Sequence, residues 1–243
     1  MKKFITMLTV MIMGCLLLAG CGDPGYMTAA ELEAENTRLQ GEAEARLKEQ
    51  EAKAEAEREK QAEEAAAANA EKKAELGITS DIYADIIIKD YGTITVKLDF
   101  DAAPLTVANF MKLAESGFYD GLTFHRIMKG FMMQGGDPLG NGGGGSDENI
   151  IGEFESNGYH NPISHVRGVI SMARANDPNS ASSQFFIVHQ DSTFLDGNYA
   201  GFGMVTEGMD VVDAVCEVAQ PVDDNGTILA EEQPVIEKIV IRK

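Results

Sequence analysis

The stretch FHRIMKGFMMQGGD, residues 124–137, places Arg126 among apolar side chains and closes on two glycines before an aspartate. Arginine stays protonated at any workable pH, and burying it without a partner is costly. One interpretation is a structural arginine at a strand edge, whose stem covers the core while its head stays in water. The other is a charge held in an apolar site for a function. These fourteen residues leave both interpretations open.

The segments around this stretch predict a protein built mainly of short strands. Residues 91–100, YGTITVKLDF, alternate apolar and polar side chains and predict a strand with one buried face. Pro104 and Gly117 bracket a predicted helix in DAAPLTVANFMKLAESG, and a second helix is predicted around residues 207–218. Further strands are predicted in LTFHRI, FMMQGG, GVISMAR, SQFFIV, GFGMV and the closing PVIEKIVIRK. Many short strands with two helices favour a β-barrel or a sandwich.

Four motifs carry a more specific signal. FHRIMKGFMMQGGD, GVISMARA, SSQFFIV and FLDGNYAGFG follow one another in an order and at separations that resemble the cyclophilin-type peptidyl-prolyl cis-trans isomerases. The resemblance runs from about Ile82 to the C-terminus. It implies an all-β fold: a closed eight-stranded antiparallel barrel capped by two α-helices, with the active groove on the outer surface of the barrel.

The resemblance also implies the residues of the site. Arg126 matches the catalytic arginine of the family. The residues that match the substrate groove are Phe131, Met132, Gln134, Ala173, Ala175, Gln184, Phe186, Phe194, Leu195 and Tyr199. No cofactor and no metal is implied.

The chemistry of prolyl isomerisation explains why an arginine is needed in an apolar groove. The peptide bond has partial double-bond character, and rotating it meets a barrier of about 18–20 kcal/mol. The twisted amide leaves a lone pair on the prolyl nitrogen, to which a fixed guanidinium can donate a hydrogen bond. Apolar side chains would hold the proline ring, and Gln134 could bind the substrate backbone and hold the arginine in place.

Three positions depart from the family pattern. Phe194 stands where a tryptophan is frequent before LDG, Tyr199 replaces a common histidine, and Arg174 stands where an asparagine is frequent. Tyrosine keeps an aromatic face and a polar tip, so turnover of peptides is expected. The missing indole N–H predicts weak or no binding of cyclosporin, the family's inhibitor, and Arg174 changes the charge of the groove rim.

The N-terminus, MKKFITMLTVMIMGCLLLAGC, is typical of a secretion signal, with two lysines, an apolar run and small residues. Leu18 to Cys21 resemble the lipobox of bacterial lipoproteins, which implies a signal peptide over residues 1–20 and a lipid on Cys21. The alternative is an uncleaved signal anchor. Both predict an extracytoplasmic protein tethered to a bacterial cell membrane.

Residues 21–77 are predicted to form a charged, mostly helical stalk ahead of an isomerase domain at residues 78–243. From Thr28 to Leu76 the chain is almost all Ala, Glu, Lys, Arg and Gln, without proline. Its leucines are too few and too unevenly spaced for a sustained coiled coil. A flexible linker of no fixed length is the alternative.

The charge of the chain excludes one class of partner. The formal net charge is −19, and residues 77–243 hold ten basic and 24 acidic residues. Such a domain would repel nucleic acid, so phosphate-backbone binding is not expected.

The remaining chemical signals favour structural interpretations. Cys216 is a lone cysteine in an apolar helical pattern and predicts a buried hydrophobe without a disulfide partner in the domain. The glycine run at 142–145 lacks the ending of a phosphate-binding loop and predicts a mobile loop beside the groove. His160 and His165, with Glu155 nearby, fit no zinc pattern and are interpreted as loop or surface histidines.

The sequence therefore predicts a lipid-anchored prolyl isomerase acting on exported, proline-containing polypeptides. X-Pro bonds relax slowly enough to limit folding, which gives such an enzyme a task. The rival hypothesis is a membrane-tethered proline-peptide binding module or holdase whose turnover is incidental. Catalysis and binding use one groove, so the sequence does not separate the two.

Overall fold

The computed structural model describes residues 27–243, so the predicted signal segment and Cys21 lie outside the described residues. The described residues divide into two units, one that ends at Ala62 and one that covers Glu63–Lys243. No helix within residues 27–243 combines the length and the apolar character that a membrane span requires.

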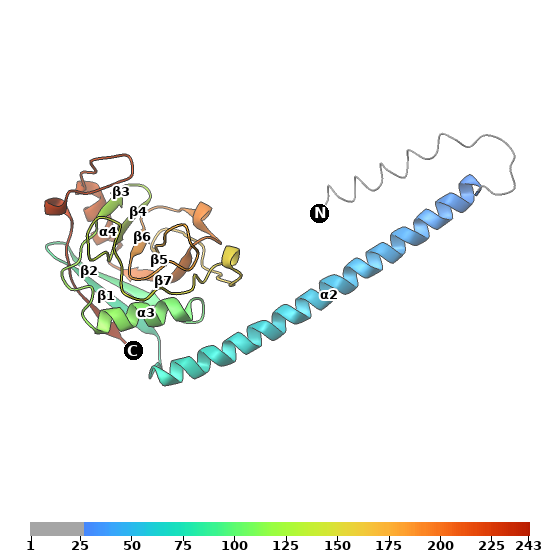
Figure 1. Cartoon of the computed structure of the whole chain (residues 1–243), viewed down its shortest axis with the longest axis horizontal. Helices are drawn as coiled ribbons and strands as arrows, with labels where there is room; N and C mark the ends of the chain where they lie inside the picture. Colours follow the sequence, from blue (N-terminus) through green and yellow to red (C-terminus); the bar gives the residue numbers. More distant parts are fainter. Residues whose placement is uncertain (1–26) are drawn as a thin grey trace. The chain divides into compact units, whose positions relative to one another are not determined.

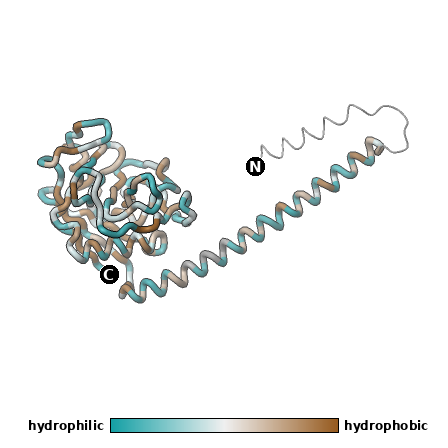
Figure 2. Tube along the Cα trace, in the orientation of Figure 1, coloured by the Kyte–Doolittle hydropathy of each residue, from teal (hydrophilic) through white to brown (hydrophobic). Residues whose placement is uncertain are grey.

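Helix α2 covers Ala29–Glu75, close to the predicted stalk. A capping box opens it, because the backbone N–H of Thr28 donates to Glu31 while the Thr28 hydroxyl accepts from the Glu31 backbone N–H. Hydrophilic and hydrophobic residues alternate along the helix without a continuous apolar stripe (Figure 2). Helix formation here therefore follows from residue propensity and capping rather than from one buried face.

The second unit is an eight-stranded antiparallel sheet in the order β3-β4-β6-β5-β7-β2-β1-β8 (Figure 1). The strands are β1 Ile82–Ile88, β2 Gly92–Leu98, β3 Arg126–Met128, β4 Met132–Gly135, β5 Val169–Met172, β6 Phe185–Val188, β7 Ala200–Glu207 and β8 Ile236–Arg242. The helices are α3 Pro104–Glu115 and α4 Met209–Val218. Both helices and seven of these strands lie in or overlap segments predicted from the residue pattern.

Strand β1, IYADIII, was not among the segments predicted as strands. Its burial alternates strictly, with Ile82, Ala84, Ile86 and Ile88 turned into the core. The terminal run of three isoleucines obscures this period in the sequence. The alternation of apolar and polar side chains before that run was the signal in the sequence that could have indicated a strand.

The prediction of a closed barrel was wrong. The sheet is an open half-barrel, and its edge strands β3 and β8 form no ladder with each other. Isolated bridges stand there instead, Arg126 with Thr227 and Thr123 with Val235. Between these two bridges the chain turns away through a short 3-10 helix at Ala230–Glu232, which interrupts any continuous ladder.

The core lies inside the curve of the sheet, with α3 packed against it. The aromatic rings of Phe110, Tyr119, Phe185 and Phe202 contact one another there, with Phe110 5.2–5.5 Å from each of the other three centroids. Glu153 accepts from the backbone N–H groups of Leu105 and Thr106 at the start of α3, where a carboxylate complements the helix dipole. Sheet, helix and preceding loop are thereby fixed together.

Two glycines let the strand that carries the site pass close to its neighbours. A Cβ on Gly135 would lie 2.6 Å from the Thr123 carbonyl oxygen. Gly136 has a φ of +81°, and a Cβ there would lie 2.7 Å from the Ser183 carbonyl oxygen. The GG pair of the opening stretch is thus required by backbone packing.

Candidate active site

Arg126 begins strand β3 and is only partly buried. Its Nε donates to the carbonyl oxygen of Asn225 at 2.7 Å, and its Nη1 donates to Oε1 of Gln134 at 3.1 Å. Nη2 lies 3.3 Å from the sulfur of Met128, and Cζ lies 5.9 Å from the centre of the Phe131 ring. Several neutral groups therefore fix the guanidinium.

No carboxylate among the described side chains forms an ion pair with Arg126, so none of them neutralises its charge at short range. Burial lowers the pKa of Arg126, while Tyr199 and Asp223 act in the opposite direction. A guanidinium remains protonated at neutral pH even so. The site therefore holds a permanent positive charge with neutral hydrogen-bond partners. Such a charge can interact with a lone pair that develops on a substrate atom.

Two glutamines connect Arg126 to the glycine loop. Nε2 of Gln134 donates to Oε1 of Gln184 at 2.9 Å. Nε2 of Gln184 in turn donates to the carbonyl oxygens of Gly142 and Gly144. The loop lies beside the groove as predicted, and it takes part in a hydrogen-bond chain that ends at Arg126.

Buried Asp137 holds that loop. Its carboxylate accepts from the backbone N–H groups of Leu139, Asn141 and Gly142 at 2.6–3.0 Å. Burial alone would raise the pKa of Asp137, but these backbone hydrogen bonds outweigh it and hold the pKa below its usual value. The aspartate that ends the opening stretch therefore stays ionised in the folded protein.

A second apolar cluster lies apart from the main core and gathers most of the predicted groove residues. Its buried members are Met132, Val169, Phe186, Val188 and Leu195, with Met128, Phe131, Ile163, Val166, Ala173 and Tyr199 packed against them. Phe194 is 72% exposed and its ring centre lies 5.5 Å from that of Phe131. Such a cluster can hold a small apolar ring beside Arg126.

Ala175 lies outside this cluster and lines an adjoining pocket of about 340 Å³. The other lining residues are Gln134, Gly142–Ser146, Asn149, Ala173, Arg174, Ser180, Ser182 and Gln184. Every predicted groove residue except Phe194 thus contacts Arg126, belongs to the apolar cluster or lines this pocket. Phe194 lies at the edge of the cluster, where its exposed ring contacts Phe131.

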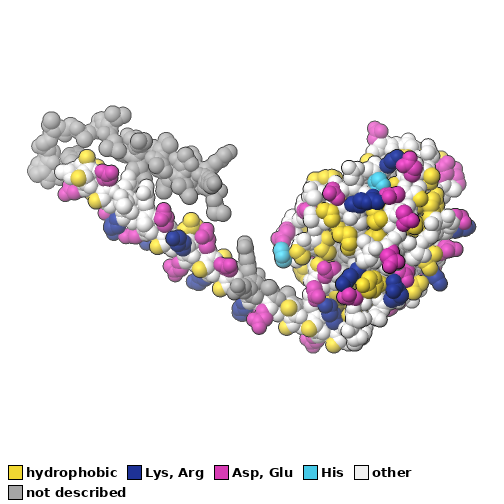
Figure 3. All heavy atoms as spheres, turned by 180° about the vertical axis from the view of Figure 1, so that it is seen from behind, with side chains coloured by type: hydrophobic (Ala, Val, Ile, Leu, Met, Phe, Trp, Pro, Cys, Tyr) yellow, Lys and Arg dark blue, Asp and Glu magenta, His cyan; other side chains and the backbone are white. Residues whose placement is uncertain are grey.

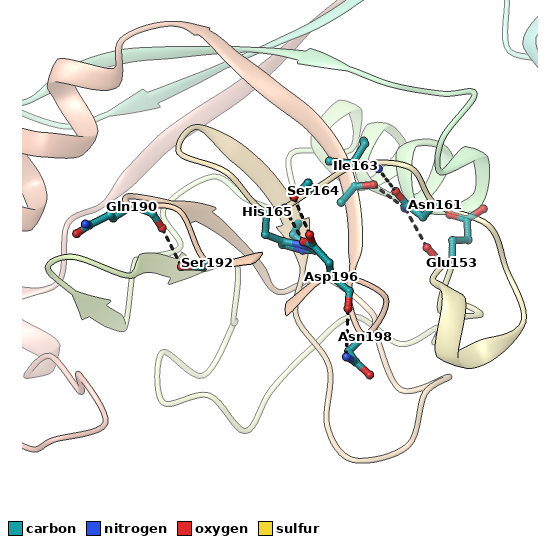
Figure 4. A network of polar contacts seen from close by, with 11 residues as sticks. Glu153, Asn161, Ile163, Ser164, His165, Gln190, Ser192, Asp196 and Asn198 are labelled. Atoms are coloured by element: carbon teal, nitrogen blue, oxygen red, sulfur yellow. Dashed lines mark hydrogen bonds and ion pairs between the residues drawn. The ribbon is translucent and has the colours of Figure 1, made fainter. Parts of the chain in front are cut away.

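A polar network anchors the loop that carries Leu195. Figure 4 shows Asp196 facing His165 and Ser164: its carboxylate accepts from the His165 backbone N–H at 2.7 Å and from the Ser164 hydroxyl at 2.6 Å. It also lies 2.9 Å from Nδ1 of His165, whose Nε2 lies 2.9 Å from the Ser171 hydroxyl. An ionised carboxylate only accepts, so Nδ1 carries the proton and Nε2 accepts from Ser171.

His165 lies in a loop, as one of the two interpretations expected, but it is not a surface residue, because its side chain is fully buried. His160 is exposed and pairs with Glu155, as expected for a surface residue. The order Ser171, His165, Asp196 resembles a catalytic triad, but both Ser171 and His165 are inaccessible. Its role is structural, and within residues 27–243 no cluster of His, Cys, Asp and Glu could hold a metal.

Replacing Asp196 by alanine should lower the free energy of unfolding by about 1–3 kcal/mol, because buried donors of His165 lose their acceptor. Burial lowers the pKa of His165, while Asp196 opposes that shift. In the unfolded chain His165 therefore takes up a proton near pH 6.5, whereas in the folded protein it stays neutral to a lower pH. The free energy of unfolding therefore falls as the pH drops below 6.5. Without Asp196 this fall should be steeper between pH 7 and pH 5.

Urea unfolding at both pH values measures the effect, with Asp147→Ala, an exposed loop aspartate, as the matched control. An unfolding free energy equal to that of the wild type at pH 7 would contradict the anchoring role.

Sequence reasoning missed the partners that hold the site from a distance. The Asn225 carbonyl is 99 residues from Arg126 and belongs to the main chain, so no side-chain signal marks it. Met128 could have been found, since it lies two residues from Arg126 in the same stretch.

Comparisons with known proteins agree with this geometry. The family model described as cyclophilin type peptidyl-prolyl cis-trans isomerase/CLD matches residues 83–242. Peptidyl-prolyl cis-trans isomerase B of Bacillus subtilis is 48% identical over 124 residues, 51% of this chain and 83% of that protein. A peptidyl-prolyl cis-trans isomerase of Helicobacter pylori is 43% identical over 146 residues, 59% of this chain and 85% of the other.

A solved structure is similar as well. The cyclophilin-type isomerase of Cryptosporidium parvum, crystallised in the presence of the dipeptide Ala-Pro, has a TM-score of 0.58 and 31% identity. The match covers 66% of this chain and 99% of that one. The chain therefore belongs to the cyclophilin-type peptidyl-prolyl cis-trans isomerases, enzymes that rotate the amide bond before proline.

Proposed function

We propose that Arg126 is the catalytic residue and that it acts by donating a hydrogen bond to the prolyl nitrogen of the twisted amide. One observation carries this proposal: the guanidinium is partly buried and held by neutral acceptors, with no carboxylate partner among the described residues. Its charge can stabilise the twisted state more than either planar state, which is the condition for catalysis. No bond to the substrate is made and no proton is transferred.

In this proposal the apolar cluster binds the proline ring of the substrate. Met132, Phe186 and Leu195 are buried members of this cluster, and Phe131 packs against it with its ring centre 5.9 Å from Cζ of Arg126. Gln134 holds the guanidinium through its side-chain oxygen. Phe194 offers an exposed ring without an N–H donor, so we expect weak or no cyclosporin binding.

The test is exchange NMR on a short Ala-Pro-Phe peptide with catalytic amounts of the full chain. Cis–trans exchange accelerated well beyond the uncatalysed rate of tens to hundreds of seconds is the expected result. Line broadening from binding without accelerated exchange would instead favour the tethered binding module or holdase.

We further propose that the substrates are exported polypeptides and that the enzyme is anchored by a lipid on Cys21. The support is the N-terminal sequence, with its lysines, apolar run and lipobox-like ending before a stalk of charged helix. A tethered isomerase would meet chains as they emerge at the extracytoplasmic face of the membrane.

Replacing Cys21 by alanine tests the anchor. We expect the variant to lose its lipid, seen as a change in mass, and to leave the membrane fraction if it is still processed. A variant whose mass differs from that of the wild type only by the lost sulfur atom would show that Cys21 carries no lipid and would favour the uncleaved signal anchor.

A further inference from the structure

Two arginines at the groove lack the carboxylate partner that the other arginines of the folded unit have. Arg167 pairs with Asp213 and Arg242 pairs with Asp85, each at 2.8 Å. Arg126 and Arg174 form no ion pair with any carboxylate in the described part of the chain. Acidic side chains are plentiful on the surface, as the face in Figure 3 shows, so their absence beside these two arginines is informative.

The guanidinium of Arg174 is held in place without losing its charge. Its Nε and Nη2 donate to the carbonyl oxygen of Asn198 at 3.0 and 2.9 Å, and Nη1 donates to that of Ala175 at 2.8 Å. Its Cζ lies 4.8 Å from the ring centre of Tyr199 and 5.0 Å from that of Phe154. Nη2 carries two N–H groups and has this one acceptor within residues 27–243, so a donor remains for a ligand.

Arg174 is also the only charged side chain among the residues that line the pocket of about 340 Å³. Gln134 lines the same pocket and contacts Arg126, so the pocket adjoins the proposed catalytic centre. A larger pocket of about 670 Å³ lies elsewhere, and the lysines on its rim already pair with Asp101 and Asp81. Of these two pockets, only the smaller presents a positive charge without a carboxylate partner among the described residues.

We propose that this pocket takes an acidic side chain of the substrate near the proline, and that Arg174 is the residue that selects it. The inference rests on the proposed function, because the pocket opens beside the groove that would hold the proline. A carboxylate there would meet a guanidinium already fixed by two rings and by the carbonyl oxygens of Asn198, Ala175 and Asn176, so little side-chain freedom is lost on binding. The two glutamine amides of the pocket offer neutral polar surroundings for it.

The experiment compares peptides that differ only by Glu or Gln, placed in turn at each of the three residues before Ala-Pro and the two residues after it. The full chain at low salt should turn over the best Glu peptide with kcat/KM about fivefold above its Gln partner. Arg174→Gln should bring that ratio close to one. Lys238→Gln removes an equal charge from an exposed position on β8 and should leave the ratio at its wild-type value.

Charge reversal provides a second variant. Arg174→Glu should turn over peptides with Lys faster than peptides with Gln at the position where the wild type prefers Glu. Because each readout is a ratio between two peptides, a general loss of activity through misfolding does not imitate it.

Each outcome has one meaning. A wild-type ratio near one at all five positions would overturn the inference while isomerisation of the Gln peptides upheld the proposed function. If Arg174→Gln still prefers the Glu peptide over the Gln peptide, Arg126 rather than Arg174 causes the preference, and the role of Arg174 is overturned. If no peptide is isomerised, the proposed function fails, and a Glu-over-Gln difference in binding affinity decides the inference by itself.

Discussion

Arg126→Ala should lower kcat/KM for an Ala-Pro peptide by about 10²–10³-fold, the size of effect seen when one donor to a developing charge is removed. In the proposed mechanism, the hydrogen bond from Arg126 to the substrate forms only when the amide is twisted and the prolyl nitrogen carries its lone pair. The loss should therefore appear in kcat with KM almost unchanged. Exchange NMR over a range of peptide concentrations separates the two constants.

Arg126→Lys is the matched variant for this test. A lysine keeps a positive charge but not the planar fork, so it cannot meet the Asn225 carbonyl and Gln134 together as Arg126 does. We expect it to lose most of the activity as well. Activity near the wild-type level in Arg126→Lys would mean that charge alone suffices, and full activity in Arg126→Ala would remove Arg126 from the mechanism.

The same variant separates the two functional hypotheses. If Arg126→Ala loses turnover, still binds prolyl peptides and no longer supports secretion in cells, catalysis is the biological task. If it loses turnover and still supports secretion, the chain works as a binding module or holdase.

Much of this site was predictable because its side chains cluster in short motifs. The opening stretch alone contributes Arg126, Phe131, Met132 and Gln134, and all four lie together in the structure. The motif around SQFF supplies Gln184 and Phe186 from the neighbouring strand β6, which pairs with β4. Antiparallel pairing thus carries motifs distant in sequence to one surface.

What the sequence could not reveal depends on main-chain groups and on long-range register. The open edge between β3 and β8 follows from where the chain around Thr227 and Val235 bridges to the sheet, and no local pattern encodes that choice. The burial of His165 depends on Asp196, 31 residues further on. A lone histidine in a loop gives no hint of such a partner.

Asp137→Ala should destabilise the folded unit by about 3 kcal/mol, because three backbone N–H groups lose a buried acceptor at once. The side chain is 1% exposed, so water cannot readily replace the carboxylate. The glycine loop should loosen, and Gln184 would then lose the fixed carbonyl oxygens of Gly142 and Gly144. Activity should fall too, because the chain of contacts from that loop ends at Arg126.

The pH dependence shows whether the charge of Asp137, rather than its shape, holds the loop. Its pKa is lower in the folded state than in the unfolded chain, so its stabilising effect is present above the ordinary value of 3.8 and is lost as pH falls through the folded pKa. Asp137→Asn keeps the size of the side chain and one acceptor but never ionises. The difference in unfolding free energy between the wild type and Asp137→Asn should be constant above about pH 5 and shrink below pH 4. A difference that stays the same down to pH 3 would mean that an uncharged acceptor serves equally well, and the loop would then be held by geometry alone.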